Sequence, residues 1–438
     1  MTHTWVGIVA AAIGLGVMIL VHEWGHFVVA RLCGVRVEVF SIGFGNRIFG
    51  WKRNGTDYRL AVFPFGGYVK MAGENPAEER TGAPDEFLAQ PRWKRLLIIL
   101  AGPFMNFVLA VVLMWGLYIT GVPVPAYFHE PANVAGVIPK SPAEKAGIKV
   151  GDRIVAINGA KVSNWNEALS NASILPGSSI SLTVDRAGST VALSEMVPEN
   201  LTYSCEVLGC PKSRVEVDSL ARGDPAIQAG LKPGDQITSI DGVAVANRDV
   251  LMAAITQSGG QALAVTGQRE GKTFTVTITP VYSDPGDGVG KRWVIGANFG
   301  PGEMVRESYP FFEAGRQAWD KNVDLSGQIL SFVGGLFSGR FSLRDTAGPV
   351  GIVKISVQAA KLGMTEFITF MAFLSINLGI LNLLPIPILD GGHVLMLAIE
   401  GSLRRDLSVA VKERFLTAGL IFLLTVIGFV TYFDILRH

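Results

Sequence analysis

Two histidines and a glutamate, in the sequence His22-Glu23-Trp24-Gly25-His26, are the residues best suited to chemistry in this chain. Histidines four positions apart lie on one helix face, so both imidazoles can bind one Zn²⁺ at about 2.0–2.1 Å. The intervening Glu23 can then take a proton from a metal-bound water. The surrounding segment is apolar, and a charged side chain at the centre of a membrane helix costs about 2.5–3.5 kcal/mol. The cluster therefore indicates a catalytic metal site rather than a structural hydrogen-bonded cluster.

A catalytic zinc site needs a third protein ligand, and the best candidate is Asp390 in the segment from Asn382 to His393. This lone carboxylate lies in a sequence apolar enough for a membrane helix. Pro385 and Pro387 should break that helix, which is tolerated at membrane depth only where protein or water covers the freed backbone groups. Asp390 is thus expected beside an irregular, hydrated cavity. His393 is a rival ligand.

Four apolar stretches are long enough to position these residues inside a membrane, since a bilayer requires about 20 residues per helix. The composition agrees, with 49% hydrophobic and only 17% charged residues, and buried core helices are the alternative. The first stretch should stay in the protein, because no Lys or Arg precedes it and no small-residue cleavage site follows it. The stretches run from Trp5 to Ala30, Leu96 to Thr120, Phe367 to Ile399 and Phe415 to Phe433.

The distribution of basic residues predicts an orientation. Lys and Arg gather between Arg31 and Arg95 and between Gly401 and Arg414, which places both segments in the cytoplasm. Four spans then put both termini and the large central region on the other side, which is the periplasm in a bacterium with an inner and an outer membrane. The balance of 38 Lys and Arg against 37 Asp and Glu gives no reason to expect nucleic acid as a partner.

The central region contains a duplication, because Ser141 to Val162 aligns without gaps onto Asp224 to Val245 with half of the positions identical. Each copy is typical of a short helix, a glycine-terminated turn and a β-strand. The pattern resembles the PDZ domains of bacterial proteases. Such domains bind extended peptides along a sheet edge, but no clear glycine loop for a terminal carboxylate is present. Peptide binding and a spacer or filter role therefore both stay open.

Smaller features complete the regions around this repeat. Asp284 to Gly290 is expected to be a loop inside the second copy. Cys205 and Cys210 fall in the external region, where a disulfide could persist, whereas Cys33 would face the reducing cytoplasm. Spacing alone leaves that bridge open. Tyr309 to Phe341 mixes aromatic and basic residues, as an interfacial helix would, and could equally pack on the PDZ domains.

The segment after the first apolar stretch predicts a β element. Val35 to Val39 and Asn46 to Val62 alternate in part, and Asn54-Gly55 is the strongest short hairpin signal in the chain. Gly43-Phe44-Gly45 adds backbone flexibility nearby. In a helical substrate, the peptide carbonyls are already engaged in hydrogen bonds within the helix, so none is free for hydrolysis. A β element beside the first apolar stretch would address this problem.

The sequence HEWGH in the first apolar stretch and NLLPIPILDGGH in the third resemble the paired signatures of the site-2 protease family. The PDZ pair between the second and third spans narrows the resemblance to the RseP-type regulatory proteases. It covers nearly the whole chain. It implies His22, His26 and Asp390 as zinc ligands and Glu23 as the catalytic base.

The same resemblance implies how a substrate would be held. Asn382 and the loop with Pro385 and Pro387 would contact the substrate, and Gly43-Phe44-Gly45 is assigned to the same task. The β element would be membrane-associated, with an edge able to pair with an unwound substrate. We expect that edge near the Asn54-Gly55 hairpin, along residues 48–52 or 58–62.

The sequence therefore predicts an α-helical polytopic membrane protein with four transmembrane helices, a membrane-associated β element and two β-rich PDZ domains. The expected boundaries are 1–123 and 365–438 for the membrane core, 124–205 and 206–300 for the PDZ domains, and 301–364 for an interfacial helical linker. Gly348-Pro349 in that linker resembles the family's GP motif.

The predicted activity is hydrolysis of a peptide bond with one Zn²⁺ per chain, in a bacterial inner membrane. The resemblance implies regulated intramembrane proteolysis of a single-span anti-sigma factor already cut on the outside, and of remnant signal peptides. The partners would be these substrates and the lipid bilayer. A metal transporter is the first alternative, although it has no use for Glu23. A PDZ-bearing scaffold with a dead metal site is the second, although it would tolerate loss of Glu23 or Asp390.

Overall fold

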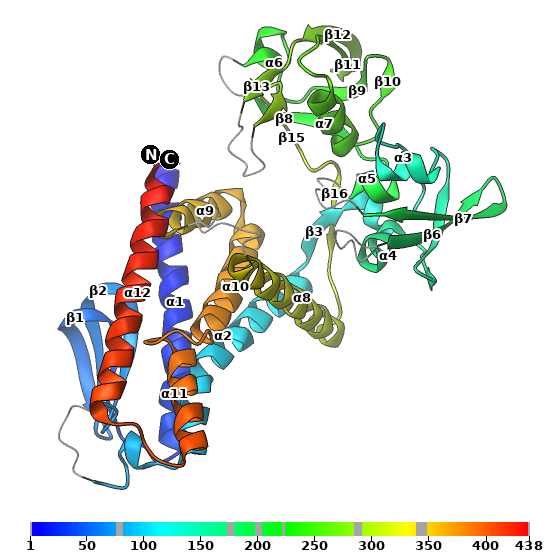
Figure 1. Cartoon of the computed structure of the whole chain (residues 1–438). Helices are drawn as coiled ribbons and strands as arrows, with labels where there is room; N and C mark the ends of the chain where they lie inside the picture. The colour runs from blue at the N-terminus through cyan, green and yellow to red at the C-terminus, as the bar shows by residue number, and fades with distance from the viewer. Residues whose placement is uncertain are drawn as a thin grey trace. The chain divides into compact units, whose positions relative to one another are not determined.

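The computed structural model of the chain (Figure 1) describes residues 2–75, 82–172, 179–197, 204–220, 224–283, 291–338 and 348–436. It contains two compact units, one made of Met1–Val122 with Ser308–His438 and the other of Pro123–Glu307. The first unit joins the two ends of the chain, which carry the two halves of the predicted metal site. The second unit contains the repeat.

The first unit is mostly helical. Four of its described helices are long and apolar enough to cross a membrane, with candidate spans at Val9–Leu32, Arg92–Thr120, Met364–Asn382 and Val409–Leu436. The prediction of four membrane helices is confirmed in these terms of length and composition. The helices are α1 (Thr2–Leu32), α2 (Arg92–Thr120), α8 (Phe311–Phe337), α9 (Pro349–Leu362), α10 (Met364–Asn382), α11 (Asp390–Leu403) and α12 (Val409–Leu436), with a short 3₁₀ turn at Phe87–Ala89.

The third apolar stretch is not one helix. α10 ends at Asn382 and α11 begins at Asp390, so the expected break is confirmed but the span is shorter than the apolar sequence up to residue 399. Pro385 and Pro387 lie in the turn between the two helices and have no N–H to continue α10. Ile388 has a φ of 78°, a left-handed conformation in the turn just before α11. The break therefore sets the direction in which α11 starts.

Small residues let α1, α2 and α10 approach one another closely. A Cβ on Gly25 of α1 would overlap the backbone carbonyl of Ala101 on α2. A Cβ on Gly379 of α10 would lie 3.2 Å from the carbonyl oxygen of Pro103. Ser375 of α10 donates to the backbone oxygen of Asn106 at 2.9 Å. Small interface residues of this kind are how helices pack in membranes.

The β element consists of β1 (Val37–Arg53) and β2 (Thr56–Met71), which pair antiparallel. The predicted hairpin is confirmed, because Asn54 and Gly55 have φ values of 50° and 81°, as a tight primed turn requires. Both strands double back, so Ser41 pairs with Arg59 on one side and Tyr68 on the other. The resulting order of segments is 47–53, 56–62, 37–44 and 66–71. The two edges are therefore 47–53 and 66–71, and 56–62 is an inner segment.

The second unit contains two sheets with separate hydrophobic cores. One sheet has the order β5-β4-β6-β7, and the other has the order β12-β11-β9-β8-β15 with β10 beside β9. The first half comprises α3 (Pro142–Ala146), β4 (Arg153–Ile157), β5 (Ala160–Lys161), α4 (Trp165–Asn171), β6 (Ser179–Arg186), β7 (Ser189–Met196) and α5 (Cys205–Leu208). The second comprises β8 (Val215–Leu220), α6 (Pro225–Gln228), β9 (Gln236–Ile240), β10 (Val243–Ala244), α7 (Arg248–Gln257), β11 (Leu263–Arg269), β12 (Lys272–Ile278) and β15 (Ala297–Phe299).

The duplication recurs in matching contacts. Arg186 makes a bidentate ion pair with Asp152 and donates to the carbonyl of Gly147. Arg269 makes the same pair with Asp235 and donates to the carbonyl of Gly230. Both carboxylates are 1% exposed, so each pair ties its helix–turn segment to the sheet. The assignment of each half as a PDZ domain stays a prediction.

The junction between the halves passes through the two cysteines. Val207 and Leu208 pack in the first core, which therefore extends past the expected boundary at residue 205. The backbone of Cys210 forms an isolated antiparallel β-bridge with Gly136 of the first half. Asn247 of the second half donates to Sγ of Cys205 at 3.3 Å. Both cysteines are free thiols and are buried. The expected loop at residues 284–290 lies outside the described residues.

Short strands close the second unit at its two ends. β3 (Val122–Pro125) pairs with β16 (Met304–Glu307), so the unit begins and ends at one two-stranded sheet. A 3₁₀ turn, η2 (Ala126–His129), follows β3, and β13 (Val281–Ser283) pairs with β14 (Arg292–Val294). The pairing of β3 with β16 means that the unit is an insertion whose ends lie side by side.

The expected linker at residues 301–364 contains two helices that belong to the membrane unit. α8 packs through Ala318 and Ile329 in one core with α2 and α10. The indole N–H of Trp115 in α2 donates to the carbonyl of Phe311 at 2.8 Å. The other face of α8 exposes Phe312 and Trp319, at 86% and 61%. An interfacial position fits this exposed aromatic face but stays a prediction.

Candidate metal centre

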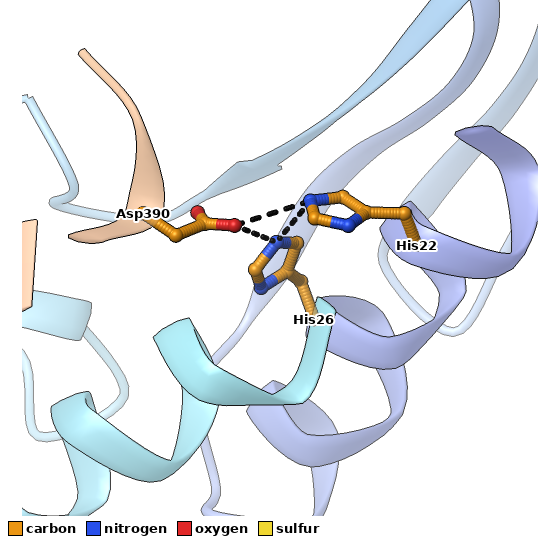
Figure 2. A group of neighbouring side chains, drawn as sticks. All are labelled: His22, His26 and Asp390. Carbon is orange, nitrogen blue, oxygen red and sulfur yellow. Dashed lines mark hydrogen bonds and ion pairs between the residues drawn. The ribbon is translucent and has the colours of Figure 1, made fainter. Parts of the chain in front are cut away.

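Three side chains predicted as metal ligands come together in the first unit. Figure 2 shows His22 and His26 on successive turns of α1, facing Asp390 at the start of α11. Oδ2 of Asp390 lies 3.2 Å from Nε2 of His22 and 3.6 Å from Nε2 of His26. The two Nε2 atoms are 3.2 Å apart. Within the described chain, His393 does not belong to this group of candidate ligand atoms.

The spacing of these three atoms fits a tetrahedral metal ion. Bonds of about 2.0–2.1 Å place tetrahedral ligand atoms about 3.3–3.4 Å apart. The observed separations of 3.2, 3.2 and 3.6 Å lie around that value. Oδ2 of Asp390 is also buried without a hydrogen-bond donor among the described residues. Two imidazoles and one carboxylate leave a fourth position open, as in catalytic zinc sites.

Each histidine is held through its other ring nitrogen. Nδ1 of His26 lies 2.8 Å from the carbonyl oxygen of Ile98 and must donate to it, which leaves Nε2 free for a metal. Nδ1 of His22 lies 3.1 Å from the side-chain amide of Asn106. The oxygen and nitrogen of an amide are assigned from hydrogen bonding, and a donating Nδ1 calls for the amide oxygen here. Asn106 is 0% exposed, so this contact is shielded from water.

α2 supplies two residues that the sequence analysis missed. Asn106 orients His22, as described above. A Cβ on Gly102 would overlap Nε2 of His26 and lie 2.8 Å from Nε2 of His22, so only glycine fits beneath the imidazole pair. The sequence Gly102-Pro103 carried a possible signal, since a glycine and a proline adjacent inside an apolar helix usually have a packing or functional reason.

Glu23 lies between the metal ligands and the β element. Its carboxylate accepts a hydrogen bond from the backbone N–H of Val69 in β2. A Cβ on Gly67 would lie 3.3 Å from Cγ of Glu23 and 2.8 Å from the carbonyl oxygen of Ser41. The backbone of segment 66–71 therefore passes directly beside the predicted base. Glycine at 67 permits that approach.

The ligands line a cavity of about 420 Å³. Glu23, Asn382 and His393 line the same cavity, and Nδ2 of Asn382 lies 3.4 Å from Nε2 of His22. Glu74, which the sequence analysis did not single out, also lines it and accepts from the N–H of Met71 at 3.1 Å. The predicted cavity beside Asp390 is thus present, and Asn382 lines it; its hydration and a substrate contact at Asn382 stay predictions.

Pro385 and Pro387 form the turn that aims Asp390 at the histidines. A Cβ on Gly419 of α12 would overlap Pro387, so α12 lies directly against this turn. Cβ atoms on Gly391 and Gly392 would overlap backbone atoms of residues 383–384 and 386. The turn is therefore packed tightly from both sides. Neither proline is among the residues that line the cavity.

Gly43-Phe44-Gly45 lies where β1 bends. Gly43 and Gly45 have φ values of 90° and 92°, which favour glycine and turn the strand back on itself. Phe44 is 48% exposed and stacks on Tyr68, with 6.1 Å between ring centroids. Tyr68 lines the cavity, whereas the three predicted residues do not. Their link to the cavity is indirect: Phe44 contacts Tyr68 of segment 66–71, and Tyr68 lines the cavity.

Known proteins resemble this chain over nearly its whole length. The model of peptidase family M50 matches residues 10–426 of the chain. A Neisseria meningitidis protein provisionally named a zinc metalloprotease is 32% identical over 459 residues, covering 99% of each chain. The regulator of sigma-E protease RseP of Escherichia coli is 34% identical over 449 residues, covering 97% of each chain.

A solved structure shares part of the sequence. It is the PDZ domain of an SdrC-like protein from Listeria monocytogenes, which is 25% identical and covers 19% of this chain and 92% of that chain, at a TM-score of 0.16. The family assignment rests instead on the match that extends over both halves of the metal centre. On that match, and on full-length relatives more than 30% identical, the chain belongs to peptidase family M50.

Proposed function

We propose that this M50 protease is a zinc-dependent intramembrane endopeptidase that cuts single-span membrane proteins. The observation that carries the proposal is the triangle of His22, His26 and Asp390, formed between a candidate membrane span and the turn that follows another. Intramembrane ionisable groups are costly and usually functional. The names of the relatives agree with zinc as the metal and proteolysis as the activity.

The residues of the metal centre have different roles in hydrolysis. His22, His26 and Asp390 hold the metal, and bound Zn²⁺ supplies a Lewis acid and a water of pKa about 7. Glu23 takes the proton of the attacking water and passes it to the leaving amine. Its hydrogen bond to the N–H of Val69 orients the carboxylate towards segment 66–71. No covalent nucleophile is required.

The substrate strand pairs with the edge at residues 66–71. The expectation of an edge at 58–62 is wrong, because segment 56–62 is paired on both sides. Residues 48–52 do lie at an edge, but on the other side of the sheet from segment 66–71, and we favour the edge beside Glu23. Tyr68, Val69 and Met71 line the metal cavity, so a peptide added here lies beside Glu23. Strand addition exposes the peptide bonds that a helix hides. Asn382 contacts the added strand from the other side of the metal centre.

The relatives and the charge distribution support a location and a substrate. The enzyme is an inner-membrane protein with residues 31–95 and 401–414 in the cytoplasm and the second unit in the periplasm. The Escherichia coli relative is named for the regulation of sigma-E. By analogy, the substrate is a single-span anti-sigma factor already trimmed outside, and remnant signal peptides are a second class. The two halves of the second unit act as PDZ domains that exclude untrimmed substrates.

The test of the chemistry uses substitutions at the metal centre. His22→Ala, His26→Ala and Asp390→Ala should each lower zinc content and abolish cleavage of a single-span model substrate. Glu23→Gln should keep zinc and bind substrate but lose turnover. His393→Ala is the matched control, because it lines the cavity outside the ligand triangle. Full activity of the Asp390 variant with loss of zinc in the His393 variant would reverse the ligand assignment.

The filter is tested by removing the second unit. β3 and β16 pair, so residues 126–303 can be replaced by a short flexible linker without separating the ends. The shortened enzyme should cleave trimmed substrate at the normal rate and also cleave untrimmed substrate. Peptide-tail binding predicts the reverse, a loss of cleavage of trimmed substrate that depends on its new C-terminal residue. If the shortened enzyme still cleaves trimmed and untrimmed substrate in the original ratio, both roles are excluded.

A further inference from the structure

The cavity that holds the metal ligands continues well beyond them. On α11 it is lined at positions 390, 393, 397 and 400, which lie on one helix face over about 15 Å. On α2 it is lined by Arg95, Ile98 and Ile99, within two turns of Gly102, which touches the histidine pair. The cavity therefore extends away from the metal centre between α2 and α11.

The walls of this extension are apolar. They are formed mainly by Phe87, Ile98, Ile99, Met396 and Leu397. Most of these side chains belong to one hydrophobic cluster that joins α1, α2, β2 and α11. A wall built from a packed cluster keeps its shape, and such a shape selects among apolar groups by size. The extension differs in this respect from the polar region around the metal ligands.

The far end of the extension is closed by ion pairs. Glu400, with a side chain 2% exposed, lies 2.7 Å from Nζ of Lys412 and 3.7 Å from Nη1 of Arg95. It also accepts from the N–H of Leu407 at 3.0 Å. Its negative charge is therefore matched within the protein, and a ligand in the extension needs no charge of its own. These ion-paired side chains close the extension at the end away from the metal ligands.

We infer that this extension is the subsite for a large apolar side chain of the substrate, directly beside the bond that is cut. The inference rests on the proposed function. Side chains of a strand added to segment 66–71 point alternately to opposite faces, so one of the two residues flanking the cut bond faces the extension. The whole cavity, metal-ligand region and extension together, has a volume of about 420 Å³, which is within the range of sites that hold small molecules. It has room for the substrate backbone at the metal and for a Leu, Met or Phe side chain in the extension.

Leu397 is the residue to change, because it lines the extension two turns beyond Asp390 and one turn before Glu400. Leu397→Ala enlarges the subsite and Leu397→Phe fills it. Single-span substrates carry Ala, Leu, Phe or Trp at each position flanking the cut bond. The unaltered enzyme should prefer Leu or Phe over Ala by at least about 10-fold in kcat/KM at one of the two positions. The Phe variant should move that preference to smaller residues, and the Ala variant to Trp.

Leu395→Phe is the matched control, since Leu395 is on the same helix but 36% exposed and outside the cavity wall. It should keep the original preference. Ile99→Ala, on the opposite wall, provides a second enlargement if a Leu397 variant fails to fold. In a Glu23→Gln background, binding of uncleaved substrates should give the same ranking without turnover. Equal rates for Ala and Phe at both positions, or equal shifts in the Leu395 and Leu397 variants, would overturn the subsite alone. Absence of zinc and of all cleavage would overturn the proposed function itself.

Discussion

Asp434, near the end of α12, accepts a hydrogen bond from the backbone N–H of Gly351 at 2.7 Å. Gly351 lies in the first turn of α9, where the N–H groups have no partner within the helix, and Asp434 is 4% exposed. The Gly348-Pro349 sequence noted above supplies the N-cap and the first residue of this helix. A carboxylate from one helix therefore caps another, and the contact fixes α12 beside α9.

Asp434→Ala should release that helix end. Hydrogen bonds to charged groups contribute roughly 1.5–3 kcal/mol, so the variant should unfold at a lower temperature in detergent. Hydrogen exchange should rise in peptides covering the start of α9. Tyr432→Phe, at an exposed position of the same helix end, is the control and should leave both measurements unchanged. Unchanged exchange in the Asp434 variant would show that the cap does not hold α9.

Asn106→Leu should weaken the metal centre although Asn106 is not a ligand. The substitution removes the group that holds Nδ1 of His22, and loss of such a partner typically lowers metal affinity or activity about 10- to 100-fold. Asn106→Asp keeps an acceptor and should restore zinc affinity in a competition assay. Ser375→Ala is the control, since Ser375 contacts only the backbone of Asn106 in this pair. Equal losses in the Leu and Asp variants would reduce Asn106 to a packing role.

Proline substitutions distinguish the two edges of the β element. Val69→Pro removes an N–H that faces Glu23, whereas Ile48→Pro alters the opposite edge. The Val69 variant should lose about 10-fold or more in kcat/KM, the equivalent of one or two hydrogen bonds. The Ile48 variant should cleave normally, with zinc content confirming that both are folded. The reverse result would restore the hairpin edge as the pairing strand.

The paired arginines make the second unit sensitive to acid. Hydrogen bonds from Arg186 lower the pKa of Asp152. Burial raises the pKa of Asp235, but hydrogen bonds from Arg269 outweigh it and the net pKa is lowered. A lowered folded pKa gives stability above the unfolded value of about 3.9, and that stability is lost as the pH falls through the folded pKa. Protection factors in this unit, which correct hydrogen exchange for its intrinsic pH dependence, should therefore fall below about pH 4, and less steeply in Asp152→Asn and Asp235→Asn. The exposed Asp218→Asn should keep the original profile.

Glu195 should act in the opposite direction. Burial in β7 raises the pKa of this side chain to about 8, and neither carboxylate oxygen has a hydrogen-bond donor among the described residues. A raised folded pKa gives stability below the unfolded value of about 4.3 that is lost as the pH rises through 8. The first half of the second unit should thus loosen between pH 5 and 8. Glu195→Gln should remove this dependence when hydrogen-exchange protection factors, corrected for the intrinsic effect of pH, are compared across that range. A persistent dependence would assign it to another group.

Several features were predictable because they depend on neighbouring residues. The i, i+4 spacing places His22 and His26 on one face of any helix that they join. Asn54-Gly55 favours its turn by backbone conformation alone, and Pro385 with Pro387 must interrupt a helix wherever it lies. The repeat is visible because the same local pattern occurs twice. Apolar length predicted the four candidate spans.

The remaining features depend on which segments the fold brings together. Asn106 and Gly102 lie in an apolar helix with no local pattern that points to His22 and His26; only the packing of α2 against α1 gives them their roles. Residues 58–62 were predicted as an edge, but the bends at Gly43 and Gly45 double β1 back, so that segment 56–62 pairs on both sides. Sequence alternation identifies strands, but the order of strands follows from long-range pairing. The sequence by itself thus determined which atoms could bind a metal, and the tertiary structure decided which backbone edge and which cavity lie beside them.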